Sequence, residues 1–118
     1  MSILKVNTLQ EATSGGATYF TSKAWVNFNG SSTVTIRDDG NVSSITDRAT
    51  GKYGVNYSVN FSNLNYAACS MIRADNDYAP TSGQPHEYST QSTSQTNLKT
   101  GSFSAAIDST VVSLIAVD

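Results

Sequence analysis

A period-two alternation of apolar and polar residues over positions 52–61 constrains the fold more than any other stretch of this chain. Alternate side chains of an extended strand point to opposite faces, so one face of this stretch is apolar and the other is small or polar. The apolar face is formed by Tyr53, Val55, Tyr57, Val59 and Phe61. Shorter alternations occur at 25–28 and 33–36, and we expect 111–117, which is apolar almost throughout, to be buried on both faces. Because no window of about 11 or more residues has a helical stripe, the pattern predicts an all-β fold.

Turn-forming residues separate the predicted strands at short intervals. The sequences NGSS after Phe28 and DDGN after Arg37 contain the Asn-Gly and Asp-Gly pairs that are typical of tight hairpins. RATGK, SNLN and the long DNDYAPTSGQPHE supply further breaks, and the last of these contains both prolines. About seven or eight short strands with reverse turns between them indicate an antiparallel β-sandwich or a small barrel. We expect a knob-like antiparallel β-sandwich over residues 23–118.

Residues 1–22 are predicted to form an extended N-terminal arm. The connector ATSGGATYFTS, at 12–22, is rich in Gly, Ser and Thr and isolates the apolar segment ILKVNTLQ from the rest of the chain. This segment can be an ordinary first strand of the sandwich, or a peptide that adds to the sheet edge of another protein or of its own copies. The flexible connector favours the second alternative. The apolar residues of the segment ILKVNTLQ are Ile3, Leu4, Val6 and Leu9.

The length and charge of the chain limit its partners. A chain of 118 residues fits one ordinary domain with an arm. Its 7 basic and 9 acidic residues give a net charge of −2, with no cluster of Lys or Arg that could neutralise phosphates, so we expect no nucleic-acid partner. The start of the chain does not read as a signal peptide, and no run of about 18 apolar residues is present, so we expect synthesis in a cytoplasm and no membrane insertion.

Two single residues and one polar segment have alternative interpretations. The only cysteine, Cys69, excludes an intramolecular disulfide, and we expect it to be a small buried hydrophobe in preference to a reactive thiol. The only tryptophan, Trp25, is predicted to fill the core between the sheets, with surface contact as the alternative. Residues 87–104 are polar at nearly every position, which predicts an edge strand or a wet interface strand.

Few residues of the chain could perform acid–base chemistry. The only histidine, His86, lies in the longest predicted loop, where a lone histidine is usually solvent-facing. The carboxylate pair Asp38 and Asp39 precedes a turn glycine, where Asp is favoured for backbone hydrogen bonds. Asp75 and Asp77 resemble the opening of a calcium loop, but the glycine and glutamate of that pattern are absent. We therefore expect no enzyme activity and no catalytic, cofactor-binding or metal-binding residues.

Much of the chain resembles a module of tail-fibre and related virion proteins of tailed bacteriophages. The resemblance rests on KAWVNFNG, VTIRDDGNVSSITD, GKYGVNYSVNF and NYA, which follow the order A-W-V-N-F-N-G, I-R, N-V-S-S-I-T-D, Y-x-V-N-F and Y-A. The beginning, ILKVNTLQ, is similar to the L-K-V-N-T segment that opens such fibre proteins. The matches cover residues 2–16 and 23–68. The resemblance implies framework or subunit-contact roles, without a catalytic role, for Trp25, Val26, Phe28, Val42, Ile45, Tyr53, Val55 and Tyr57.

The resemblance implies a virion protein, made in the host cytoplasm, that acts as a short tail fibre or fibre tip. We expect a homotrimeric knob that attaches to another virion protein through Ile3, Leu4, Val6 and Leu9 of its arm. Contact with a host-surface glycan or protein is expected in the loop between 75 and 88, which does not follow the family pattern. The residues expected to make this receptor contact are Asp75, Asp77, Tyr78, His86 and Tyr88.

Two alternatives remain open at this stage. The shortness of the chain also fits a capsid decoration protein, whose arm would clamp neighbouring capsid subunits. A third reading is a polysaccharide depolymerase, which would need a carboxylate pair such as Asp75 and Asp77 in a groove between subunits.

Overall fold

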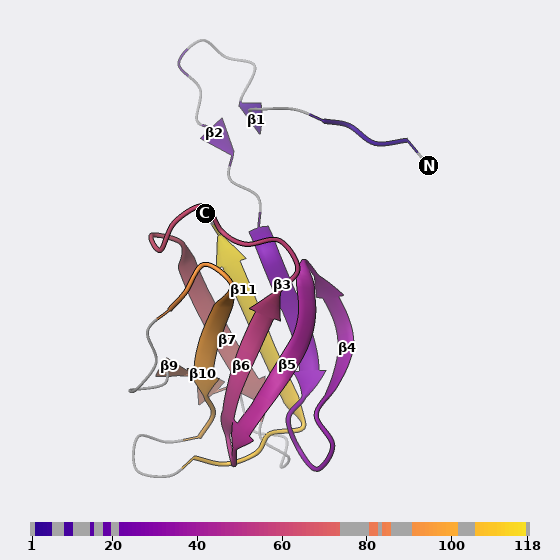
Figure 1. The fold of residues 1–118 in the computed structure, drawn as a ribbon, viewed down its shortest axis with the longest axis vertical. Helices are drawn as coiled ribbons and strands as arrows, with labels where there is room; N and C mark the ends of the chain where they lie inside the picture. The colour runs from indigo at the N-terminus through magenta and orange to yellow at the C-terminus, as the bar shows by residue number, and fades with distance from the viewer. Residues whose placement is uncertain are drawn as a thin grey trace.

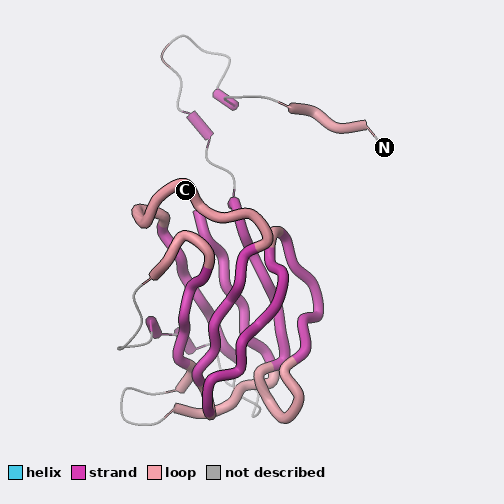
Figure 2. Tube along the Cα trace, viewed as in Figure 1, coloured by secondary structure: helices cyan, strands magenta, loops and turns pink. Residues whose placement is uncertain are grey.

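The computed structural model describes most of the predicted sandwich and parts of the arm. The described residues are 2–5, 9–10, 15, 18–19, 22–73, 81–82, 84–85, 91–101 and 106–117. Within them every regular element is a β-strand, and the pairing is antiparallel throughout (Figures 1 and 2). The predicted all-β antiparallel β-sandwich is therefore confirmed.

Two sheets face one another in the sandwich (Figure 1). The five-stranded sheet has the order β4 (Thr35–Gly40), β3 (Ser22–Asn29), β11 (Val111–Val117), β7 (Ala67–Arg73) and β8 (Thr81–Ser82). The four-stranded sheet has the order β5 (Val42–Ala49), β6 (Lys52–Tyr57), β10 (Gln95–Lys99) and β9 (Gln84–Pro85). A third sheet consists of β1 (Leu9–Gln10) and β2 (Thr18–Tyr19), which pair with each other.

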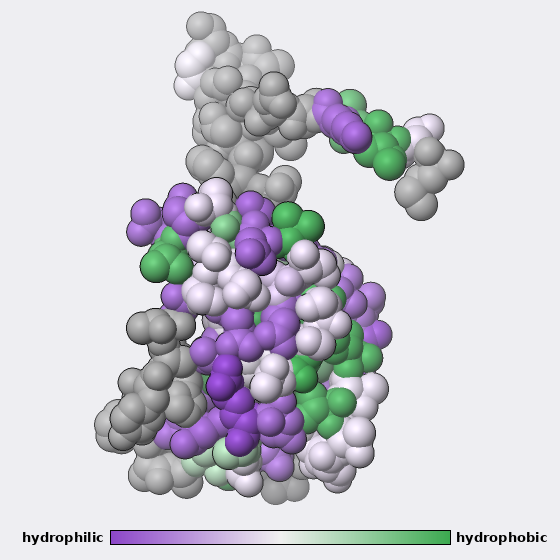
Figure 3. Space-filling model, in the orientation of Figure 1, coloured by the Kyte–Doolittle hydropathy of each residue, from purple (hydrophilic) through white to green (hydrophobic). Residues whose placement is uncertain are grey.

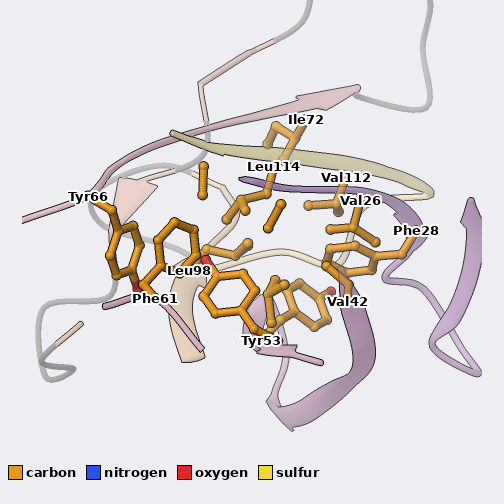
Figure 4. Close-up of a cluster of buried hydrophobic side chains, with 14 residues drawn as sticks. Val26, Phe28, Val42, Tyr53, Phe61, Tyr66, Ile72, Leu98, Val112 and Leu114 are labelled. Atoms are coloured by element: carbon orange, nitrogen blue, oxygen red, sulfur yellow. The ribbon is translucent and has the colours of Figure 1, made fainter. Parts of the chain in front are cut away.

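The core lies between the inner faces of the two large sheets (Figure 4). In the five-stranded sheet, Phe28 and Ile72 flank Val112 in register, and all three are buried. From the other sheet, the ring of Tyr53 packs edge-on against Phe28, with 5.2 Å between the ring centroids. Each fully buried aliphatic or aromatic side chain stabilises the fold by about 1.5–3 kcal/mol. The buried cluster comprises Ala24, Val26, Phe28, Val42, Tyr53, Val55, Tyr57, Phe61, Tyr66, Ile72, Leu98, Val112, Leu114 and Ala116.

The alternation at 52–61 is confirmed as a strand only as far as Tyr57, although Phe61 beyond the strand is also buried, as predicted. Tyr53, Val55 and Tyr57 of β6 are buried, as predicted, but the strand ends at Tyr57 and Val59 is exposed. Beyond the strand, the Val59 amide donates to the side chain of Asn41 at 2.7 Å, a contact that replaces regular strand pairing.

The two predicted tight hairpins have different outcomes. The chain after Phe28 joins β3 to β4, which pair with each other, so this hairpin is confirmed, although its loop at 30–34 is longer than a tight turn. The hairpin predicted at DDGN is wrong, because β4 pairs with β3 and β5 pairs with β6. The chain crosses there from one sheet to the other within one residue, Asn41, whose φ of 59° lies in the left-handed region that Asn tolerates.

The described part of the polar segment 87–104 contains β10, which lies between β6 and β9 and is not the outermost strand of its sheet. Leu98 and Thr96 of β10 point into the core and are buried. The Thr96 hydroxyl lies 2.5 Å from the hydroxyl of Tyr57 and 2.8 Å from that of Tyr66. A buried threonine is tolerated here because two tyrosines satisfy its hydrogen bonds.

The arm is described at 2–5, 9–10, 15 and 18–19. In Figure 1, β1 and β2 lie away from the two large sheets. Ile3 and Leu4 are 73% and 85% exposed. The division of the chain at residue 22 stays a prediction. Nowhere in the part of the chain that the structure describes is there a helix with the length and hydrophobicity that crossing a bilayer requires.

Candidate functional site

The structure places few of the residues expected to contact partners. The five expected receptor-contact residues, Asp75, Asp77, Tyr78, His86 and Tyr88, lie outside the described residues. The same holds for Val6 of the arm, and for Leu9 only the backbone in β1 is described. Ile3 and Leu4 are described, and both present their apolar side chains to solvent.

An apolar surface that the sequence analysis did not predict covers part of the outer face of the five-stranded sheet. Trp25, Ile115 and Cys69 form one row across β3, β11 and β7, since Ile115 is the register partner of both of the others. Met71 lies two residues further along β7 on the same face. Trp25, Ile115 and Met71 are 38%, 47% and 52% exposed, and Cys69 is also exposed. We call these four residues the Trp25 face.

Three predictions are corrected at this surface. Trp25 does not fill the core, because its neighbours Ala24 and Val26 point inward and alternation directs Trp25 outward. Cys69 is exposed and not buried, because it lies in register with Ile115 on the outer face of the sheet. β11 is not covered on both faces, because Leu114 is buried on the inner side while Ile115 on the outer side is nearly half exposed.

The indole of Trp25 lies across Gly40, its register partner on β4. A Cβ atom built on Gly40 would collide with the pyrrole edge of the indole, so the ring occupies the space that any larger residue would fill. Gly40 thus allows the ring to lie close against the backbone of the neighbouring strand. The exposed Trp25 side chain therefore packs along one edge against β4.

A shallow hollow of about 330 Å³ lies over β3 and β11 beside this ring. Trp25 and Ile115 contribute its apolar walls, and Ser22, where β3 begins, lies at its border. Asn27 and Ser113 line its polar side, where the Asn27 amide donates to the Ser113 hydroxyl at 3.1 Å. The hollow can accept an apolar side chain, but it contains no arrangement of groups for catalysis.

The outer face of the four-stranded sheet has the opposite character. Asn56 donates through Nδ2 to the hydroxyls of Ser44 and Thr46 at 3.0 and 2.9 Å. Its Oδ1 accepts from Gln95 at 2.5 Å, and Gln95 Oε1 accepts from Arg48 at 2.7 Å. Figure 3 shows this hydrophilic surface over β6 and β10. These polar side chains satisfy one another, so this face is built to be solvated.

The residues with shifted pKa values belong to the core. Burial raises the pKa of Tyr53, and its hydrogen bond to Asp108 raises it further. Burial also raises the pKa of Tyr57, against a smaller lowering by its hydrogen bond to Thr96. Both hydroxyls point into the protein and keep their protons, so neither is an acid–base group for an external substrate.

The described ranges contain no group of three or more His, Cys, Asp and Glu residues arranged to hold a metal ion. Comparisons with protein-family models, with curated proteins and with solved structures found no match. The geometry therefore defines a β-sandwich with one polar and one apolar outer face, and an arm with exposed apolar residues.

Proposed function

We propose that this chain is a non-enzymatic structural protein of a tailed-bacteriophage virion, a short tail fibre or fibre tip. Its sandwich forms a trimeric knob, and its arm attaches the knob to another virion protein. The proposal starts from the resemblance in residues 2–16 and 23–68. Six of the eight residues with an implied framework or contact role are buried in the core, which fits that role: Val26, Phe28, Val42, Tyr53, Val55 and Tyr57.

The single observation that supports association most strongly is the position of Trp25. It belongs to the A-W-V-N-F-N-G stretch, yet it lies on the surface, beside exposed Ile115, Cys69 and Met71. A large aromatic side chain held at a surface among other apolar groups is typical of the centre of a protein contact. Together with exposed Ile3 and Leu4, it gives the chain two separate apolar surfaces for assembly.

This proposal assigns contact with the host surface to the segment 75–88, which was predicted as a loop and contains the two short strands β8 and β9. Its single-site contacts would be weak, and several copies on one virion would multiply them. Residues 75, 77, 78, 86 and 88 are the ones to replace in a cell-binding assay once the assembly is known.

The experiment that tests the proposed function combines molar mass with copy number. Light scattering of the purified chain should give the mass of a trimer, and quantitative counting in intact virions should find tens of copies. A trimer present in hundreds of copies would replace this proposal with capsid decoration. Absence from virions would overturn both.

A further inference from the structure

We propose that copies of this chain meet one another through the Trp25 face, with Trp25 and Ile115 at the centre of the contact. The number of copies, three, rests on the proposed function. The position of the contact rests on the described residues alone.

The two outer faces of the same sandwich differ in polarity. A sheet with one face on the core and one in water is expected to be polar on the water side. The four-stranded sheet follows this rule, since Asn56 and Gln95 bond to their polar neighbours on its outer face. The five-stranded sheet departs from it at its middle strand, where Ile115 lies between Trp25 and Cys69. The apolar face is therefore specific to one side of the molecule.

The Trp25 ring packs against the neighbouring strand. Because Gly40 has no Cβ atom, the indole packs closely against the backbone of β4, and this contact limits the positions that the ring can adopt. A contact residue that is ordered in advance loses little conformational entropy on binding. Tryptophan residues in such positions commonly dominate the free energy of an interface.

The charges on and beside the Trp25 face are compatible with a second copy of the chain as the partner. The row of Trp25, Ile115 and Cys69 is uncharged. The charged residues beside it have opposite signs: Arg37 donates to the Asn27 side chain at 3.4 Å, and Asp38 is the register partner of Asn27. Copies that meet here can therefore place Arg37 of one chain near Asp38 of another at the rim, so that neither charge is buried without a partner. The hollow beside Trp25 can receive an apolar side chain from the facing copy.

The arm of the chain joins the sandwich at this surface. Ser22, the first residue of β3, borders the hollow, so the arms of copies that meet here all start beside the contact.

The size of the Trp25 face sets the strength that we expect. A standard interface buries about 800 Å² on each partner, more than four side chains provide. The Trp25 face is thus the centre of the contact, and association should respond to protein concentration. The parent chain should show monomers at high dilution and the larger assembly on concentration.

The only tryptophan and the only cysteine of the chain both lie on this face, so both side chains report on the contact without any substitution. As light scattering shows association, Trp25 emission should shift to shorter wavelength and become less accessible to acrylamide. Alkylation of Cys69 by a maleimide should slow over the same concentration range. Unchanged Trp25 emission and Cys69 reactivity across the association would overturn the inference.

The variant Ile115→Lys tests the position of the contact. It places like charges where copies meet, and we expect association at least tenfold weaker than in the parent. Leu64→Lys is the matched control, because Leu64 is 57% exposed but lies in the loop between β6 and β7, and it should associate like the parent. Should Ile115→Lys lose its β-sheet circular dichroism, Met71→Lys at the margin of the face serves in its place, with at least a threefold weakening expected.

The outcomes separate this inference from the proposed function. A folded Ile115→Lys chain that associates like the parent overturns the Trp25 face as the contact, while a trimeric parent counted in virions keeps the proposed function. A parent that stays monomeric at every concentration overturns the inference. Its presence or absence in virions then decides the proposed function independently.

Discussion

The hydroxyl of Tyr53 connects three parts of the chain that are distant in sequence. Its proton is shared between the carbonyl oxygen of Gly30, at 2.6 Å, and Oδ1 of Asp108, at 2.9 Å. The same Oδ1 atom accepts the amide proton of Gly51 at 2.7 Å. The β3–β4 turn, the β5–β6 turn and the segment before β11 are thus joined at one buried point.

We expect Tyr53→Phe to lower the free energy of unfolding by about 1–3 kcal/mol, because the buried Gly30 carbonyl loses its donor. Asp108→Asn keeps an Oδ1 acceptor and should stay within about 0.5 kcal/mol of the parent. Urea denaturation followed by circular dichroism measures both. Equal losses in the two variants would mean that the charge of Asp108 matters, and not the acceptor at that position.

The raised pKa values of Tyr53 and Tyr57 predict a loss of stability in alkali. In the unfolded chain both hydroxyls ionise near pH 10, whereas burial keeps them protonated in the fold. Their contribution is therefore complete below about pH 9, and it falls by up to about 1.4 kcal/mol per tyrosine for each pH unit above 10. Urea midpoints between neutral and alkaline pH measure the slope. In Tyr57→Phe the free energy of unfolding should fall less steeply with pH than in the parent. The same steepness in the double variant Tyr53→Phe with Tyr57→Phe as in the parent would contradict this account.

At the scale of elements, the crossing from β4 to β5 depends on Asn41. Its side chain bonds to both backbone groups of Val59, donating to the carbonyl at 3.0 Å and accepting from the amide at 2.7 Å. Its own carbonyl accepts from the Ser58 amide at 3.1 Å. One residue thus ends a strand of one sheet, starts a strand of the other and fixes the chain that leaves β6.

Substitutions at Asn41 separate the backbone effect from the side-chain effect. Asn41→Gly keeps easy access to positive φ and loses only the side-chain bonds, whereas Asn41→Ala also incurs the left-handed backbone penalty of about 1–2 kcal/mol. We expect the Ala variant to be less stable than the Gly variant by about 1 kcal/mol in urea denaturation. An Ala variant at least as stable as the Gly variant would show that the crossing relaxes to negative φ.

The elements also show what could be predicted from the sequence and what could not. The buried face of β6 and the β3–β4 hairpin follow from local alternation and local turn residues, so both were predictable. The crossing at Asn41 was not, because Asp-Gly followed by Asn suits a hairpin as well, and only burial of Val42 on the opposite sheet decides between them. Trp25 was predictable in principle, since the same alternation that buries Val26 and Phe28 directs it outward. The alternation alone does not say whether Trp25 or the pair Val26 and Phe28 faces the core. That is decided by packing across the whole core, so the apolar face was not predicted.

At the scale of the whole molecule, the two surfaces that we propose for assembly lie outside the core that determines stability. Ile3 and Leu4 are mostly exposed, so replacing them removes no core contact. The Trp25 face likewise lies on the far side of the five-stranded sheet from the buried cluster. Folding and assembly should therefore separate cleanly in variants of this chain.

The double variant Ile3→Ser with Leu4→Ser tests this separation at the arm. We expect its free energy of unfolding to stay within about 0.5 kcal/mol of the parent, because both side chains are exposed in the isolated chain. Its copy number in virions produced with the variant in place of the parent should fall several-fold, because burial of two aliphatic side chains against a partner would be lost. Leu64→Ser, an equally conservative change at an exposed apolar residue of the sandwich, should be incorporated normally. Normal incorporation of the arm variant would contradict attachment through Ile3 and Leu4.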